Sequence, residues 1–377
     1  MQLTVQVQLM PDDVQAAALL ATMKQFNEVC NYVSKIAFDY KCYHPVALHN
    51  LRIDDTNISL YYRLRTMYID ISSMHIQLIF RKVADAYKID HNKKKKLKKP
   101  CRFKDMSAIT YNHINLNLRH IYHNPMNIGF LSINTIFGRA KMYFIFGDHQ
   151  DKLFLRNRNV GEMKLVYKQK RFYLNIITEQ PESNTITHTQ YLGVDLGINN
   201  IATTSQGKLY SGAQIDRIRT KYQMHRSSLQ KCGSKSAKRR LKLVSGKEAS
   251  FRKDINHCIS KEIVANAKGT NSGIVLEDLT HIREKITVRK QQRSRMHGWS
   301  FHQLREFITY KAQLHGIPVV CVDPRHTSQR CSVCGHTERK NRKSQFRFHC
   351  LVCGHDAHAD YNAACNLATM GDNNILR

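Results

Sequence analysis

Apolar and polar residues alternate in LTVQVQL (residues 3–9), which predicts a strand. After Pro11 and Asp12 the apolar residues recur in alternating steps of four and three, which predicts a long helix with one apolar stripe. The stripe comprises Leu19, Met23, Phe26, Cys30, Val33, Ala37 and Tyr40. A second stretch has similar spacing at Ile76, Phe80, Val83 and Tyr87. Residues 11–100 are therefore predicted to be a helical module.

Residues 101–190 carry short β-type runs separated by turn residues. In KLVYKQKRFYLNII (164–177) the apolar positions are spaced as two strands around the polar turn KQKR, which predicts a hairpin. Those positions are Val166, Phe172, Leu174 and Ile176. With a first strand in residues 1–10, this pattern predicts a small β-barrel around the helical insertion. No catalytic constellation is recognisable in residues 1–190, so this half is interpreted as a binding platform.

The second half of the chain alternates strands and helices. YLGVDLGINNIATTSQG (191–207) predicts an apolar strand ending in Asp195, a glycine-containing turn and a returning strand. A basic helical segment (235–268) precedes GIVLEDL (273–279), a predicted strand that ends in Glu277 and Asp278. A helix near 301–315 and a strand in PVVCVDP follow, and Asp360 opens a short helix, DYNAACNLA. This is an α/β pattern with acids at the edges of its elements.

Two CxxC pairs, Cys331 with Cys334 and Cys350 with Cys353, are separated by fifteen residues (335–349). This spacing is typical of a structural zinc site with four thiolate ligands. Gly335 and Gly354 follow the two pairs, where a tight knuckle favours a residue that tolerates positive φ.

Disulfides are the alternative use of these cysteines. The total of 11 cysteines is odd and no signal peptide is recognisable, so a reducing compartment and a zinc site are expected. The other cysteines have no partner at ligand spacing and are interpreted as small apolar residues. They are Cys30, Cys42, Cys101, Cys232, Cys258, Cys321 and Cys365.

The charge of the chain indicates its partner. Lys and Arg total 59 against 29 Asp and Glu, a formal net charge of +30, so a polyanion is expected. A membrane surface is disfavoured because the chain has no apolar run of about 18 residues. Even the most apolar stretch, 128–147, is broken by Arg139 and Lys141 and alternates like strands. Nucleic acid is therefore the expected partner.

A lysine run, HNKKKKLKKP (91–100), ends the helical module. It is interpreted equally well as a solvated linker, as a phosphate contact or, in a eukaryotic host, as a nuclear signal.

Asp195, Glu277 and Asp360 each have an ordinary structural explanation, as a turn residue, a surface residue and a helix N-cap. If the fold brings them together, however, their charges repel one another unless divalent cations compensate. Carboxylate oxygens suit Mg²⁺ or Mn²⁺, and a pair of such ions supports phosphodiester hydrolysis. The zinc knuckle is then expected to fix the direction of Asp360. Their joint occurrence in a very basic chain favours a nuclease.

The ordered motifs GVDLGINNIATTSQG, GIVLEDL, DPRHTSQRCSVCG, CLVCG and AHADYNAACNL resemble those of the TnpB family of RNA-guided nucleases from insertion sequences, relatives of type V CRISPR effectors. The resemblance covers residues 191–367. It implies a RuvC-like nuclease of the ribonuclease H type, in residues 191–330 and 354–377, interrupted by a zinc ribbon at 331–353. Asp195, Glu277 and Asp360 match the family's three catalytic, metal-binding acids.

The resemblance further implies a wedge-type β-barrel (residues 1–10 and 101–190) with a helical recognition module (11–100) inserted. The expected partners are a guide RNA from the transposon end and target double-stranded DNA, with base pairing reading most of the target. A monomer on the RNA, no membrane, and a cytoplasmic, nucleoid-associated location are expected; a nuclear location applies only in a eukaryotic host.

Three alternatives share some of these features. A compact type V CRISPR effector has the same catalytic and zinc motifs. A nuclease-inactive RNA-guided repressor is expected to lose an acid, whereas all three are present. A zinc-ribbon accessory protein that binds transposon DNA needs neither the acids nor a guide.

Overall fold

The computed structural model describes residues 1–53, 57–92, 99–121, 128–148, 150–151, 153, 160–180, 183–185, 187–188, 190–279, 301–344 and 346–375. The chain divides into two compact units, Met1–Pro181 and Glu182–Arg377. Most of the lysine run, Lys93 to Lys98, lies outside the described residues, so its interpretation stays open.

The first unit begins with β1 (Gln2–Met10) and four helices: α1 (Asp13–Asp39), α2 (Pro45–Asn50), α3 (Leu60–Met67) and α4 (Ser73–Asn92). Asp12 caps α1, because its carboxylate accepts a hydrogen bond from the Gln15 backbone N–H at 2.8 Å. The predicted apolar stripe of α1 is buried as far as Ala37. The prediction was wrong at Tyr40, which is 47% exposed because α1 ends at Asp39.

Together with β1, the other strands of the first unit form one antiparallel sheet in the order β2-β6-β7-β1-β5-β4-β3. Their bounds are β2 (Ile109–Tyr111), β3 (Leu116–Ile121), β4 (Ile128–Thr135), β5 (Gly138–Ile145), β6 (Val160–Lys168) and β7 (Arg171–Glu179). The predicted β6–β7 hairpin is confirmed, but its turn is tighter than KQKR: Lys168 pairs with Arg171, and Gln169 and Lys170 adopt positive φ.

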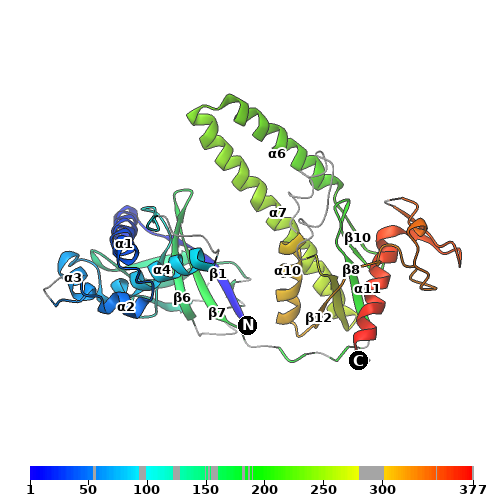
Figure 1. Cartoon of the computed structure of the whole chain (residues 1–377), viewed down its shortest axis with the longest axis horizontal. Helices are drawn as coiled ribbons and strands as arrows, with labels where there is room; N and C mark the ends of the chain where they lie inside the picture. Colours follow the sequence, from blue (N-terminus) through cyan, green and yellow to red (C-terminus); the bar gives the residue numbers. More distant parts are fainter. Residues whose placement is uncertain are drawn as a thin grey trace. The chain divides into compact units, whose positions relative to one another are not determined.

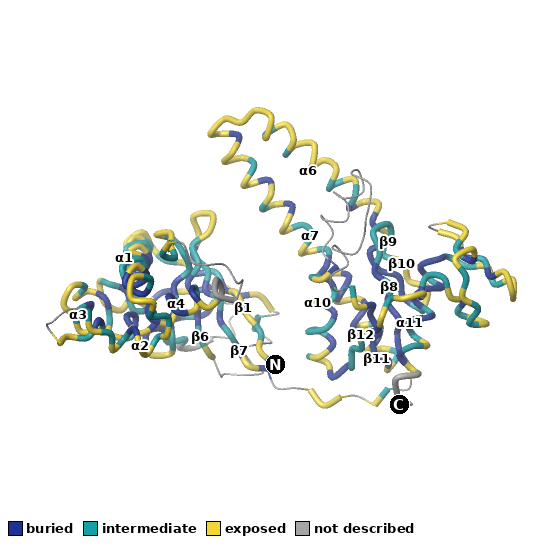
Figure 2. Tube along the Cα trace, viewed as in Figure 1, coloured by how far each residue is buried: buried dark blue, intermediate teal, exposed yellow. Residues whose placement is uncertain are grey.

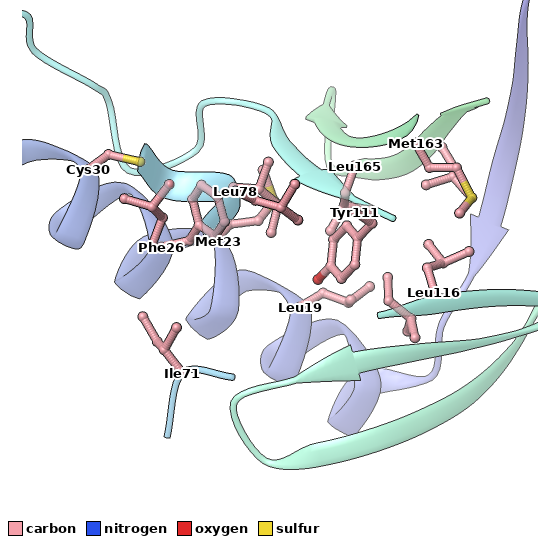
Figure 3. Packing of buried hydrophobic residues seen from close by; sticks show 14 of the residues in the cluster. Leu19, Met23, Phe26, Cys30, Ile71, Leu78, Tyr111, Leu116, Met163 and Leu165 are labelled. Atoms are coloured by element: carbon pink, nitrogen blue, oxygen red, sulfur yellow. The ribbon is translucent and has the colours of Figure 1, made fainter. Parts of the chain in front are cut away.

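The helices and the sheet of the first unit share one hydrophobic core. Leu19, Met23 and Phe26 of α1 lie in the same cluster as Tyr111 of β2 and Leu165 of β6 (Figure 3). The Tyr111 hydroxyl donates to the Asn134 carbonyl at 3.1 Å, so the edge strand β2 approaches β4, which neighbours the opposite edge strand β3. The sheet is therefore close to a barrel.

The second unit contains a five-stranded sheet in the order β10-β9-β8-β11-β12 (Figure 1). The strands are β8 (Gln190–Asp195), β9 (Asn200–Thr204), β10 (Leu209–Ser211), β11 (Ser272–Glu277) and β12 (Val319–Val322). β8, β9 and β10 are antiparallel, whereas β8, β11 and β12 are parallel. This confirms the predicted α/β pattern with apolar strands that end in Asp195 and Glu277.

The described helices of this unit are α6 (Ala213–Cys232), α7 (Lys235–Gly269), α10 (Phe301–Leu314) and α11 (Ala359–Ile375). The ribbon between β12 and α11 contains a 3₁₀ turn (Arg339–Asn341) and the short hairpin β13 (Arg347–His349) with β14 (Asp356–His358). Among the described helices, none is both long and apolar enough to cross a membrane.

Helix α11 packs against β8 at close range. An added Cβ at Gly193 of β8 would stand 2.0 Å from the Ala364 carbonyl oxygen and 2.6 Å from the Ala368 nitrogen, so only glycine permits this approach. The prediction of a short helix was wrong in length, because α11 continues to Ile375. Asp360 lies in its first turn, one residue after its start.

Candidate metal centres

The structure brings the three predicted acids to one edge of the second sheet. β8 and β11 are parallel neighbours with Val194 opposite Leu276, so the strands end side by side in Asp195 and Glu277. Asp360 stands in the first turn of α11, the helix that packs on β8. Glu277 and Asp360 are only 7% and 5% exposed. Three carboxylates from distant parts of the sequence therefore share a poorly hydrated region.

Burial and neighbouring charges shift the pKa values of Asp195 and Glu277. Burial raises the pKa of Asp195 well above its ordinary value, and the nearby charges of Glu277 and Asp360 raise it further, while Arg342 opposes the shift. Burial also raises the pKa of Glu277, and the Thr327 hydrogen bond and Arg342 act in the opposite direction. Without a cation, the fold disfavours the ionised form of these groups.

Three polar residues contact Glu277 and Asp360, and no local sequence pattern marks them. The Thr327 hydroxyl donates to Glu277 Oε1 at 2.7 Å, and Asn200 Nδ2 donates to Asp360 Oδ2 at 2.9 Å. Arg342 lies between the two cysteine pairs, and its guanidinium is 3.5 Å from Asp360 Oδ1. The Thr327 hydrogen bond occupies one carboxylate oxygen of Glu277 and leaves the other available to a cation, whereas both oxygens of Asp360 have a protein partner.

The donor set fits a divalent cation. Carboxylate oxygens are hard ligands of the kind that Mg²⁺ and Mn²⁺ take, and one or two such ions would compensate the burial and the like charges that raise the pKa of Asp195. The single positive charge of Arg342 lowers the pKa values of both Asp195 and Glu277 but leaves both raised.

The four predicted zinc ligands also come together. The thiol sulfurs of Cys331, Cys334, Cys350 and Cys353 all lie within 4.8 Å of one another. The Cys331–Cys353 and Cys334–Cys350 sulfur distances are 3.7 and 3.5 Å. A tetrahedral site with Zn–S bonds of about 2.3 Å separates its sulfurs by about 3.8 Å, so the cluster has the size that zinc requires.

The two knuckles adopt the predicted geometry. Gly335 and Gly354 have φ of 76° and 71°, and their N–H groups donate to the carbonyls of Cys331 and Cys350 at 3.0 and 3.1 Å. Backbone N–H groups, that of Cys353 foremost, lower the pKa of Cys350 to about 6, which favours the thiolate form that binds metal.

All 11 cysteines lie in the described part of the chain, and none of them forms a disulfide. The interpretation of the seven non-ligand cysteines as small apolar residues holds for buried Cys30. Cys232, Cys258 and Cys321 are exposed. Spacing alone does not reveal on which face of an element a lone cysteine lies.

Hydrogen bonds connect the ribbon to α11. The Asn362 side chain accepts from the Ser332 N–H at 3.0 Å and donates to the Arg330 carbonyl at 2.7 Å. Asn366 Nδ2 donates to the carbonyls of Thr327 and Arg330 at 2.8 and 2.7 Å. The cysteine cluster is thus attached to the helix that carries Asp360.

Two solved structures share the fold of this chain. It is similar to Cas12f1 in a solved complex with sgRNA and target DNA, with a TM-score of 0.61 and 13% identity over 98% of each chain. It is also similar to the mini-RNA-guided endonuclease CRISPR-Cas_phi3, with a TM-score of 0.57 and 11% identity over 98% of this chain and 92% of that chain. The chain therefore has the fold of the Cas12 effectors.

Two family models and several curated relatives match parts of the chain. The model of the Cas12f1-like TNB domain matches residues 301–367, and the model OrfB_IS605, described as a probable transposase, matches residues 175–282. A CRISPR-associated endodeoxyribonuclease Cas12f1 of Sulfoacidibacillus thermotolerans is 31% identical over 60% of this chain and 57% of its own length. The putative RNA-guided DNA endonuclease InsQ of Escherichia coli is 29% identical over 53% of this chain and 54% of its own.

A TnpB-like protein of Methanocaldococcus jannaschii is 34% identical over 36% of this chain and 49% of its own length. These matches confirm the resemblance to the TnpB family that the ordered motifs predict. The chain spans about half the length of these curated relatives.

Proposed function

We propose that the chain is an RNA-guided DNA endonuclease that cleaves target double-stranded DNA beside a short motif. The observation that carries this proposal is the meeting of Asp195, Glu277 and Asp360 at one sheet edge. The endonuclease names of the Cas12f1 and InsQ relatives support it. The proposed partners are a guide RNA from the transposon end, bound by one protein molecule, and target DNA in the nucleoid.

The three acids are proposed to hold Mg²⁺ or Mn²⁺, which when bound activates water and stabilises the leaving oxygen of a phosphodiester. The chain's own contribution is to position the ligands. Thr327 and Asn200 each hold one oxygen of an acid, and Arg342 reduces the negative charge around them. Zinc on the four cysteines is proposed to be structural and to fix the ribbon from which Arg342 extends.

The domain assignment is part of the same proposal. Residues 191–330 and 354–377 form a RuvC-like nuclease of the ribonuclease H type, and residues 331–353 form the zinc ribbon. The strand order β10-β9-β8-β11-β12, with mixed antiparallel and parallel pairing, supports this assignment. Residues 1–10 and 101–190 form the wedge barrel and residues 11–100 the recognition module, supported by the nearly closed sheet and its shared core.

A compact type V CRISPR effector is the second candidate, favoured by the Cas12f1 relatives. The two candidates differ in their guides. Sequencing the RNA that copurifies with the chain separates them: a transcript from a transposon end supports the first candidate, and RNA from a repeat array supports the second. Copurification of unselective cellular RNA alone would contradict guidance by RNA in either form. A repressor function is disfavoured because the three acids lie together.

A further inference from the structure

One segment of the second unit has an extreme charge composition. Residues 217–247 contain eleven Lys and Arg residues and no Asp or Glu. These 31 residues hold more than a third of the formal net charge of +30. A net charge of about 2 to 8 is enough to keep a small domain soluble, so solubility does not explain this concentration of charge.

The segment forms a helical hairpin made of α6 and the first part of α7, joined at Gly233 (Figure 1). It extends away from the sheet of its unit, and most of its surface is exposed (Figure 2). Glu248, the first acid after the segment, is buried and pairs with Arg226 across the two helices at 2.9 Å. The hairpin thus has an internal link between its arms, and its other basic residues remain largely on the surface.

One face of α6 is hollowed and rich in hydrogen-bond donors. The hollow has a volume of about 550 Å³ and is lined by Thr220, Gln223, Met224, Ser227, Ser228 and Lys231. Hydroxyl, amide and ammonium groups are the side chains that commonly contact phosphate and sugar oxygens. None of the described residues that line the hollow carries a carboxylate that would repel a phosphate.

The composition also indicates the form of nucleic acid. Proteins that bind single strands offer aromatic side chains on which bases stack. Residues 217–247 contain two residues with an aromatic ring, His225 and Tyr222, and Tyr222 is partly buried. A basic surface with hydroxyl groups and few aromatic rings is suited to the backbone of a double helix, which is bound by shape and charge.

We propose that the α6–α7 hairpin binds the sugar-phosphate backbone of a double helix. The inference rests on the proposed function for its setting, since an RNA-guided nuclease meets structured RNA, target DNA and an RNA–DNA hybrid. In this proposal the hairpin contributes to nucleic-acid affinity, and this contribution does not depend on Asp195, Glu277 or Asp360. α6 alone is about 30 Å long by its rise per residue, enough to extend across a duplex.

The test replaces Lys238, Arg239 and Arg240, which are exposed on α7, with Gln in the full-length chain. Gln is nearly as good a helix former as Lys and Arg, so the helix should persist. The control replaces Lys24, Lys35 and Lys88, three exposed lysines of the first unit, with Gln. Both variants lose three positive charges, and circular dichroism and thermal unfolding check that both stay folded.

Binding is measured by fluorescence anisotropy against a DNA duplex, an RNA hairpin, an RNA–DNA hybrid and oligo(dT), from about 50 to 200 mM salt. We expect the hairpin variant to lose about tenfold in affinity for a duplex probe, and its log–log salt slope to become shallower by about two to three. The three duplex probes identify which double helix the hairpin prefers. The control should lose much less.

Two results would overturn the proposal: equal losses in the hairpin variant and the control, or a loss for oligo(dT) as large as for every duplex. Neither depends on cleavage. Combining the hairpin substitutions with Asp360→Ala keeps the two proposals distinguishable, because the binding loss should persist whether or not Asp360 takes part in cleavage.

Discussion

Replacing Gly193 with Ala tests whether the contact between β8 and α11 sets the geometry of the acids. Gly193 lies two residues before Asp195, and its contact Ala364 lies four residues after Asp360. The added Cβ would stand 2.0 Å from a backbone oxygen, where ordinary contact begins at 3.4 Å. Strand and helix must therefore separate by about 1.4 Å at this point, because neither backbone can move aside as a flexible side chain can.

Such overpacking typically costs about 1–3 kcal/mol of unfolding free energy. For a unit of this size, that corresponds to a fall of about 2–12 °C in the melting temperature. A displacement of about 1 Å between catalytic groups can lower a rate by about 10²-fold. We therefore expect Gly193→Ala to slow DNA cleavage by about two orders of magnitude while binding of guide RNA and target persists.

The assay measures single-turnover cleavage and target binding separately, with zinc content and thermal unfolding in parallel. Gly269→Ala is the matched control, because a Cβ at Gly269, the last residue of α7, meets nothing within 4 Å. This control should cleave like the wild type. If Gly193→Ala cleaves as fast as the control and melts no lower, the close approach of β8 and α11 does not position the acids.

Three further predictions concern the metal centres. Asp195→Asn should abolish cleavage yet raise stability in magnesium-free buffer. Burial and like charges raise the pKa of Asp195 in the folded chain, so wild-type stability falls as the pH rises from the ordinary pKa of an aspartate to this raised pKa. Urea unfolding at several pH values should show a smaller fall in the variant. Cys331→Ser should release about one zinc per chain and lower stability, measured by elemental analysis, whereas Cys232→Ser, at an exposed cysteine, should keep the metal. Thr327→Val removes a hydrogen bond that lowers the pKa of Glu277, so the acid limb of the pH–rate profile should move to higher pH; an unchanged profile would exclude this role.

The sequence predicted those features that depend on local pattern. Apolar runs that end in a charge identified β8 and β11, and the CxxC spacing identified all four sulfurs that gather in the ribbon. Each signal lies within a few residues or in a fixed spacing, so it is visible without knowledge of the fold.

Features that depend on contacts between distant segments were not predictable. Asn200 and Asp360 are 160 residues apart and Thr327 and Glu277 are 50 apart, so no local pattern connects them. The length of α11 was missed for a related reason. Gly371 suggests a helix end, but it packs closely against Tyr191 and Val275, so tertiary contact continues the helix through it.

The most direct test of the account compares the RNA-loaded wild type with Asp360→Ala on a matched double-stranded DNA target, in Mg²⁺, scoring binding and cleavage separately. The account predicts that binding is unchanged within about twofold, since it depends on base pairing and the basic surface, and that cleavage is lost, since the site loses a ligand. Equal cleavage by the two proteins would remove Asp360 from the site and contradict the proposal that these three acids perform the chemistry.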